Sequence, residues 1–349
     1  MQLLPKFKIF NQDNGQTGTF QLPDIDPETD ELFMNADDLY FEMEFEKSKK
    51  LLRRIINKHP GHTDAYFLLA DIAMDENQPN KALNILKEAV QFYNQVIPVD
   101  FDGEIPWGTV ENRPYLMLLH ELLISFDRNE NAKGAIDTGE QILAYNPNDN
   151  QGIRWLMGDL YLRSEQLKEA EKFLRQNIDQ YPPNRYSYAL LLMKQKKRWD
   201  AITQFRLGFL ENIYVSEMLR LKTPLIQYQI FEPSNLNGLS VATDYVLNMG
   251  DYWFQHMDAM QMMDLLMGHQ TVSTEINGVF NHLHEIYTLP LYRETLSSFD
   301  DLESDMDIEE MNRKTRKEIF NEIDKIKKNV NTSSSKKILK DLDDFWNKN

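Results

Sequence analysis

The sequence predicts an all-α fold built from repeated pairs of helices. Mostly small residues recur in one slot of a repeating register, and a second set of small residues follows twelve positions later. Small side chains at a fixed spacing indicate two helices that pack closely, because large side chains would hold the helices apart. The first slot holds Ala36, Ala70, Leu123, Gly158 and Ala189, and the second holds Ser48, Ala82, Ala135, Ala170 and Ala201.

Proline marks the end of the second helix in three of these pairs. Pro60, Pro147 and Pro182 stand twelve residues after the second slot, and proline cannot continue a helix because it lacks the N–H donor. The second and third pairs are further apart in sequence than the others, which places an insertion at about 97–115. Its Pro, Gly and Asp residues predict a surface loop. The pairs start near Thr29, Thr63, Leu116, Gln151 and Pro182.

The register divides the chain into four segments. Residues 1–28 carry turn residues without periodicity and are expected to be an extended leader. Residues 29–215 carry five helix pairs, and 216–290 are expected to form irregular helices that close the array. Residues 291–349 predict a charged helical tail. We expect this tail to dock on the body of the protein, the alternative being that it binds a partner.

Composition limits the classes of function. A chain with 42% hydrophobic and 27% charged residues is typical of a globular protein, and no apolar run is long enough to span a membrane. The chain has no cysteine, which excludes thiolate chemistry. Its net charge of -17 disfavours nucleic acid as a partner. The opening residues show no signal peptide, and we expect a cytoplasmic, acidic protein without a membrane partner.

The register resembles the tetratricopeptide repeat over about 29–215, and Gly158, Tyr161, Ala170 and Pro182 carry the resemblance best. It implies a right-handed superhelix of helix pairs, a solenoid that binds other proteins and does not catalyse. The region after the repeats is similar to the carboxy-terminal region of suppressor of tumorigenicity 7 proteins. That similarity rests on Pro224, Ser240, Ala242, Tyr245 and Trp253.

The resemblance also implies a binding groove, lined by two positions of each first helix. Aromatic side chains would supply contact area, and carboxylates would select and steer a basic partner. The expected ligand is therefore an extended protein segment with apolar anchors and Lys or Arg between them. Alternatively, each aromatic residue packs against the neighbouring pair as core. The groove candidates are Phe33, Phe67, His120, Trp155 and Tyr186 at one position, and Asp37, Asp71 and Asp159 at the other.

The insertion allows two interpretations. Ile105, Pro106 and Trp107 are expected to fill the gap between the second and third pairs, with Arg113 paired to a local acid. The charged residues of the loop instead favour a functional role at the mouth of the groove, since long loops often carry function.

Two other classes of function remain as alternatives to a protein-binding adaptor. A self-associating structural protein would use the carboxy-terminal helices. A metal-dependent enzyme would need a site such as His282, His284 and Glu285, or His59 with His62. Residues two apart on a helix face different directions, so His282 and His284 would not share an ion. No phosphate loop, nucleophile elbow or zinc-binding helix motif occurs. We therefore expect no catalytic residue, metal or cofactor; the sequence leaves the partner and the oligomeric state open.

Overall fold

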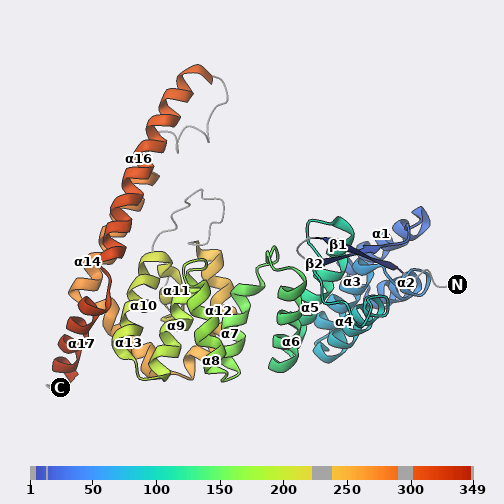
Figure 1. Cartoon of the computed structure of the whole chain (residues 1–349), viewed down its shortest axis with the longest axis horizontal. Coiled ribbons are helices and arrows are strands. Elements are labelled where there is room, and N and C mark those ends of the chain that lie inside the picture. The colour runs from blue at the N-terminus through green and yellow to red at the C-terminus, as the bar shows by residue number, and fades with distance from the viewer. Residues whose placement is uncertain (1–4, 13–14, 222–237, 290–301, 347–349) are drawn as a thin grey trace. The chain divides into compact units, whose positions relative to one another are not determined.

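The protein forms two compact units, Met1–Ser164 (unit 1) and Glu165–Asn349 (unit 2). Figure 1 shows this computed structural model, in which nearly all regular structure is helical. The predicted all-α architecture is confirmed, with the addition of a small two-stranded sheet. The structure describes residues 5–12, 15–221, 238–289 and 302–346.

Unit 1 is a stack of antiparallel helices in which each helix packs on the next in sequence. The first helix of the second pair also contacts the first helices of the pairs on either side. The helices are α1 (Pro27–Phe41), α2 (Phe45–Lys58), α3 (Thr63–Asp75), α4 (Pro79–Asn94), α5 (Arg113–Arg128), α6 (Ala132–Tyr145) and α7 (Ile153–Arg163).

The two slots of the register lie inside the helix pairs. All ten slot residues are buried, including the single large one, Leu123. In the first pair the Ser48 hydroxyl donates a hydrogen bond across the interface to the Ala36 carbonyl oxygen at 2.7 Å. In the first pair the small residues therefore lie where the two helices meet.

The turn inside each pair has the same backbone conformation. The residue seven positions after the first slot has a positive φ in all five pairs, between 55° and 60°. In the second pair the following amide, of Gln78, donates to the Ala73 carbonyl at 2.8 Å, the closing bond of a Schellman motif. The five residues are Met43, Asn77, Glu130, Glu165 and Lys196. Of these residue types only asparagine favours the left-handed backbone region, so the packing of the helices imposes this conformation on the turn.

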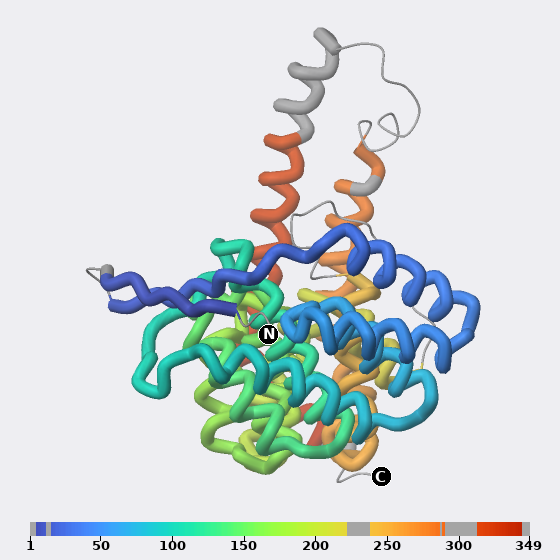
Figure 2. Tube along the Cα trace, turned by 90° about the vertical axis from the view of Figure 1, so that its right-hand side faces the viewer, coloured from blue at the N-terminus to red at the C-terminus, as the bar shows by residue number. Residues whose placement is uncertain are grey.

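The leader is a β-hairpin, which the sequence prediction did not include. Strands β1 (Lys6–Gln12) and β2 (Gly15–Gln21) are antiparallel, with Lys6 opposite Gln21, and Figure 2 shows them side by side. The insertion extends this sheet by one bridge: the Gly18 amide donates to the Glu104 carbonyl at 2.7 Å. At Gly103 a Cβ atom would lie 2.3 Å from the Gln16 carbonyl oxygen, so this approach requires glycine.

The insertion packs into unit 1 through Ile105, whereas Pro106 and Trp107 are only partly buried, so the filling of the gap between the second and third pairs by all three stays a prediction. Ile105 is fully buried and its amide donates to the Tyr145 carbonyl at 2.7 Å. The expected ion pair of Arg113 is wrong for the described residues: its guanidinium lies 5.5 Å from the Trp107 ring and donates to the Trp107 carbonyl at 3.1 Å. A short 3-10 turn, η1 (Val110–Asn112), then leads into α5.

Unit 2 surrounds a core of large side chains, among them the fully buried Trp253 and Phe205. Helix α10 is central, since it contacts α13, α14 and α17 in addition to its neighbours in sequence, α9 and α11. Helix α17 lies against α10, and α16 lies along α14 (Figure 1), so the tail folds back on unit 2. The helices are α8 (Leu167–Asn177), α9 (Pro183–Lys194), α10 (Arg198–Glu211), α11 (Ile213–Leu219), α12 (Leu239–Phe254), α13 (Met257–Gly268), α14 (Gln270–Tyr287), α16 (Leu302–Asn329) and α17 (Thr332–Trp346).

Candidate protein-binding site

The first helices of three pairs form one face of unit 1, because α3 contacts both α1 and α5. Five of the predicted groove residues lie on these helices, and none of the five is buried. Asp71 is exposed and the others are partly exposed. The structure therefore brings together Phe33 and Asp37 from α1, Phe67 and Asp71 from α3, and His120 from α5.

Asp71 lies in an environment that disfavours its charge. Solvent reaches its side chain, yet its pKa is raised, mainly because protein atoms crowd the carboxyl and displace water from it. The negative charges of Glu121 on α5 and Asp75 on α3 raise the pKa further, while Arg128 opposes them.

Tyr40 connects α1 to the same set of charges. Its hydroxyl donates to Asp75 Oδ2 at 2.9 Å. The pKa of Tyr40 is raised, first by this hydrogen bond and by burial, and further by the charges of Asp71 and Asp37. We call Asp37, Tyr40, Asp71, Asp75 and Glu121 the acidic face. Its carboxylates come from three successive first helices.

Sequence reasoning missed three members of the acidic face. Tyr40 stands three residues after Asp37, and Asp75 stands four after Asp71, so helical spacing alone places each pair on one side of its helix. Glu121 has no such signal, because its proximity to Asp71 depends on how α5 packs beside α3.

The aromatic candidates have a mixed role. The Phe33 ring lies 5.2 Å from the ring of His62, which caps α3 by accepting from the Ala65 amide at 3.2 Å. Phe33 thus packs partly against the neighbouring pair. Trp155 on α7 is 36% exposed and covers Gly152. Each keeps a part of its ring available to a ligand.

Two predicted residues are buried. Tyr186 on α9 is 0% exposed, and its hydroxyl donates to the Asn212 carbonyl at 2.6 Å. Its ring packs near Phe209 and Tyr245, because the helices that close the array cover this position. The prediction that Tyr186 lines a groove is therefore wrong. Asp159 on α7 is 7% exposed and does not belong to the accessible face.

The histidine candidates have structural roles or local partners. His59 Nε2 lies 2.8 Å from Asp26, the residue that caps α1. Lys58 first and His59 second hold the pKa of Asp26 well below its ordinary range. His282 Nδ1 lies 3.5 Å from Glu285. Among the described residues no three His, Asp or Glu side chains lie close enough to hold a metal ion.

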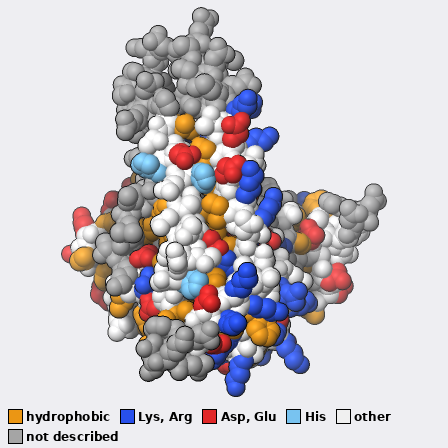
Figure 3. Space-filling view, turned by 90° about the vertical axis from the view of Figure 1, so that its left-hand side faces the viewer, with side chains coloured by type: hydrophobic (Ala, Val, Ile, Leu, Met, Phe, Trp, Pro, Cys, Tyr) orange, Lys and Arg blue, Asp and Glu red, His pale blue; other side chains and the backbone are white. Residues whose placement is uncertain are grey.

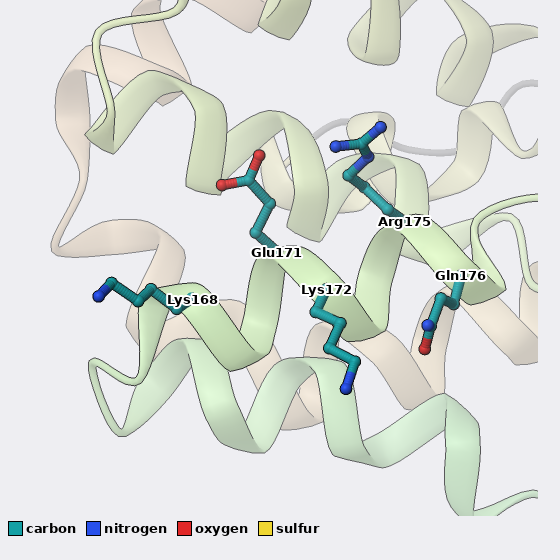
Figure 4. Close-up of a pocket in the computed structure, with 5 residues that line it drawn as sticks. All are labelled: Lys168, Glu171, Lys172, Arg175 and Gln176. Atoms are coloured by element: carbon teal, nitrogen blue, oxygen red, sulfur yellow. The ribbon is translucent and has the colours of Figure 1, made fainter.

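A second polar surface follows α8 in unit 2. Figure 4 shows Glu171 and Arg175 pointing to one side of this helix and Lys172 to the other. Glu171 accepts from Gln195 at 2.9 Å and pairs with Lys197 at 3.3 Å. No ion pair of Lys168, Lys172 or Arg175 occurs within the described residues. These three cations line an open, shallow hollow and form no enclosed site.

Comparison with known proteins gives a family for the repeats. No curated protein matches the chain with significance, so the similarity to suppressor of tumorigenicity 7 proteins stays a prediction. Its Pro224 also lies outside the described residues. In the helices that the structure describes, no stretch is both long and apolar enough to cross a membrane.

Three solved structures illustrate the likeness. A tetratricopeptide repeat protein from Parabacteroides merdae is 14% identical, covering 84% of this chain and 100% of that chain, with a TM-score of 0.43. MamA is 16% identical over 57% of this chain and 98% of that chain, with a TM-score of 0.42. YrrB, described as having an unusual peptide-binding site, is 14% identical over 51% of this chain and 82% of that chain, with a TM-score of 0.38. The family model of the tetratricopeptide repeat matches residues 44–97 and 128–194.

Proposed function

We propose that this protein is a non-catalytic adaptor whose acidic face binds an extended segment of another protein. The segment would carry Lys or Arg between apolar residues. Carboxylates from α1, α3 and α5 would pair with its cations, and the partly exposed rings of Phe33 and Phe67 would contact its apolar side chains.

One observation carries the proposal: the acidic face gathers like charges without balancing them. Asp71 is repelled by both Asp75 and Glu121, and a single cation, Arg128, is among the charges that act on it. Like charges at neighbouring helical positions destabilise the folded chain. Their retention on an accessible face is explained if a bound cation neutralises them, because functional sites commonly carry such costs.

The electrostatics of the whole chain support the same class of partner. A net charge of -17 attracts a basic segment over a distance and repels nucleic acid and anionic membranes. The expected cytoplasmic location and the absence of cofactor and metal remain part of this proposal.

Self-association through the tail is less favoured, because the α17 residues Ile338 and Leu342 are 2% and 8% exposed, covered by the other helices of unit 2.

The proposal is tested by affinity capture from native lysate, followed by cross-linking mass spectrometry. We expect the wild-type chain to retain a protein whose cross-linked segment is rich in Lys or Arg and apolar residues. Asp37→Lys with Asp71→Lys should reduce the retained amount about tenfold or more, since two attractive contacts become repulsive.

A matched control separates this effect from a change in net charge. Asp100→Lys with Asp102→Lys makes the same charge change at exposed positions of the insertion, outside the acidic face. This control should retain the partner. Equal capture by both variants and the wild-type chain would contradict the proposed site, provided circular dichroism shows that both variants are folded.

A further inference from the structure

We propose that unit 2 carries a second docking site, of opposite charge, for an acidic protein segment with one apolar anchor. The site lies where α17 meets the start of α10 and the end of α13. It goes beyond the acidic face of unit 1, and it would let one chain hold a basic and an acidic partner at separate surfaces.

The first part of the site is a basic patch around a tryptophan. Trp199 is 45% exposed, and Lys336 Nζ lies 5.2 Å from the centre of its ring. Arg198 Nη1 lies 4.0 Å from Asp343 Oδ1, and both side chains are more than half exposed. Lys336, Lys340 and Asp343 follow helical spacing on α17. Both contacts therefore place this side of α17 next to the first turn of α10.

Further exposed lysines lie close in sequence to the patch. Within the described residues, Lys196, Lys337 and Lys340 are exposed and make no ion pair. Figure 3 shows Lys and Arg side chains gathered at its lower right around a small hydrophobic patch.

The second part is a cleft beside the patch, with a volume of about 390 Å³. Arg198 and Asp343 belong both to the patch and to the lining of the cleft, so the two are continuous. Gln261 and Asp258 also line it. The apolar lining comes from α9, α13 and α17, namely Met193, Met262, Leu265, Leu339 and Leu342.

The combination selects one class of ligand. An apolar side chain of the ligand would enter the cleft, and flanking carboxylates would lie against Arg198, Lys336 and Lys340. Methionine in the lining suits this role, because its flexible thioether adapts to different anchors. Asp258 and Asp343 also line the cleft, so the ligand's carboxylates would lie on the side of Lys336 and Lys340, and only its apolar side chain would enter the cleft. An apolar anchor flanked by separate carboxylates is the pattern of a protein segment.

The test uses a phage-displayed library of random twelve-residue peptides, selected on the full-length chain. We expect enriched peptides in which Asp or Glu flank Leu, Ile, Phe or Trp. The most enriched peptide, called the winner below, is then synthesised and its affinity for the chain is measured by fluorescence anisotropy. Arg198→Glu with Lys336→Glu should weaken binding about tenfold or more. Lys168→Glu with Lys172→Glu, the same charge change on α8, should leave it nearly unchanged.

Further arms make each part of the site testable on its own. Leu265→Gln places a polar group in the cleft and should weaken the winner while leaving the basic patch intact. Asp37→Lys with Asp71→Lys should not weaken it, which separates this site from the proposed function of unit 1. Hydrogen exchange of α17 checks that each variant keeps its tail docked.

Three results would overturn the proposal. One is that selection yields no peptide with flanking acids. Another is that the winner binds the Arg198→Glu, Lys336→Glu variant as tightly as the wild-type chain. The third is that a single-stranded DNA oligonucleotide or a phosphatidylserine vesicle displaces the winner and binds more tightly than it does, which would assign the patch to phosphate ligands.

Discussion

Arg206 on α10 fastens the tail to unit 2, and its removal is predicted to release α17. The side chain is 1% exposed. Its Nε donates to Glu275 Oε2 on α14 at 3.0 Å, and its Nη2 donates to the other oxygen of that carboxylate. Its Nη1 donates to the hydroxyls of Ser334 and Ser335 on α17, each at 2.9 Å. One guanidinium thus links three helices.

The expected cost follows from what Arg206→Met leaves behind. The methionine fills much of the volume, but Glu275, whose side chain is 14% exposed, loses its counter-charge. Removing one partner of a buried ion pair costs about 3–5 kcal/mol. We therefore expect the free energy of unfolding of unit 2 to fall by about that amount, and the amides of α17 to exchange about a hundredfold faster or more.

The assay is urea denaturation followed by circular dichroism, together with hydrogen-exchange mass spectrometry of α17. Arg175→Met on α8 is the control, because Arg175 is exposed, and it should change stability by less than about 0.5 kcal/mol. Adding Glu275→Leu to Arg206→Met should recover much of the loss, since no buried charge then remains unpaired. Protection of α17 at the wild-type level in Arg206→Met would refute the reasoning.

Three smaller effects are also predicted. Asp71→Asn should raise the free energy of unfolding at pH 7 by about 0.2–0.5 kcal/mol, because the folded chain disfavours this carboxylate. The pKa of Asp71 is raised in the folded chain, so its charged form destabilises the fold above that pKa. The advantage of Asp71→Asn should therefore disappear as acid protonates the wild-type carboxyl. Urea denaturation of the wild-type chain and of the variant at pH 7 and at pH 3.5 measures this difference. Asn112→Ala should cost about 3 kcal/mol in unit 1, since the fully buried Asn112 accepts from the Phe20 amide at 3.0 Å and donates to two carbonyls; wild-type stability would contradict this. Glu130→Gly should stabilise by up to about 1 kcal/mol by relieving a φ of 55°, and a lower melting temperature would show that the turn carries no strain.

The repeat architecture could be predicted because it depends on local spacing. Small residues at Ala36 and Ser48 must meet whenever two helices pair closely, and the same slots are buried in every pair. The strands of the hairpin could not be assigned in the same way. Their alternating residues become a stable sheet through pairing with each other and through the bridge from Thr17 to Glu104 in the insertion, a contact that is far apart in sequence.

The candidate site was predictable only in part for the same reason. Asp37 and Asp71 follow from the register, whereas Glu121 joins them through the packing of α5 beside α3. Tyr186 shows the opposite failure. Its slot matches the other aromatic positions, but the slot says nothing about the later helices that cover it, and Tyr245 from α12 packs against its ring.

The central claim is that the acidic face binds a basic segment through charge. The most direct measurement is a charge exchange, using the cross-linked segment as a synthetic peptide and the Asp37→Lys, Asp71→Lys variant. Our account predicts that the variant binds the natural peptide about tenfold or more weakly. It also predicts that a peptide with its Lys and Arg changed to Glu regains affinity for the variant. The account is contradicted if the natural peptide binds both chains equally and the exchanged peptide binds neither.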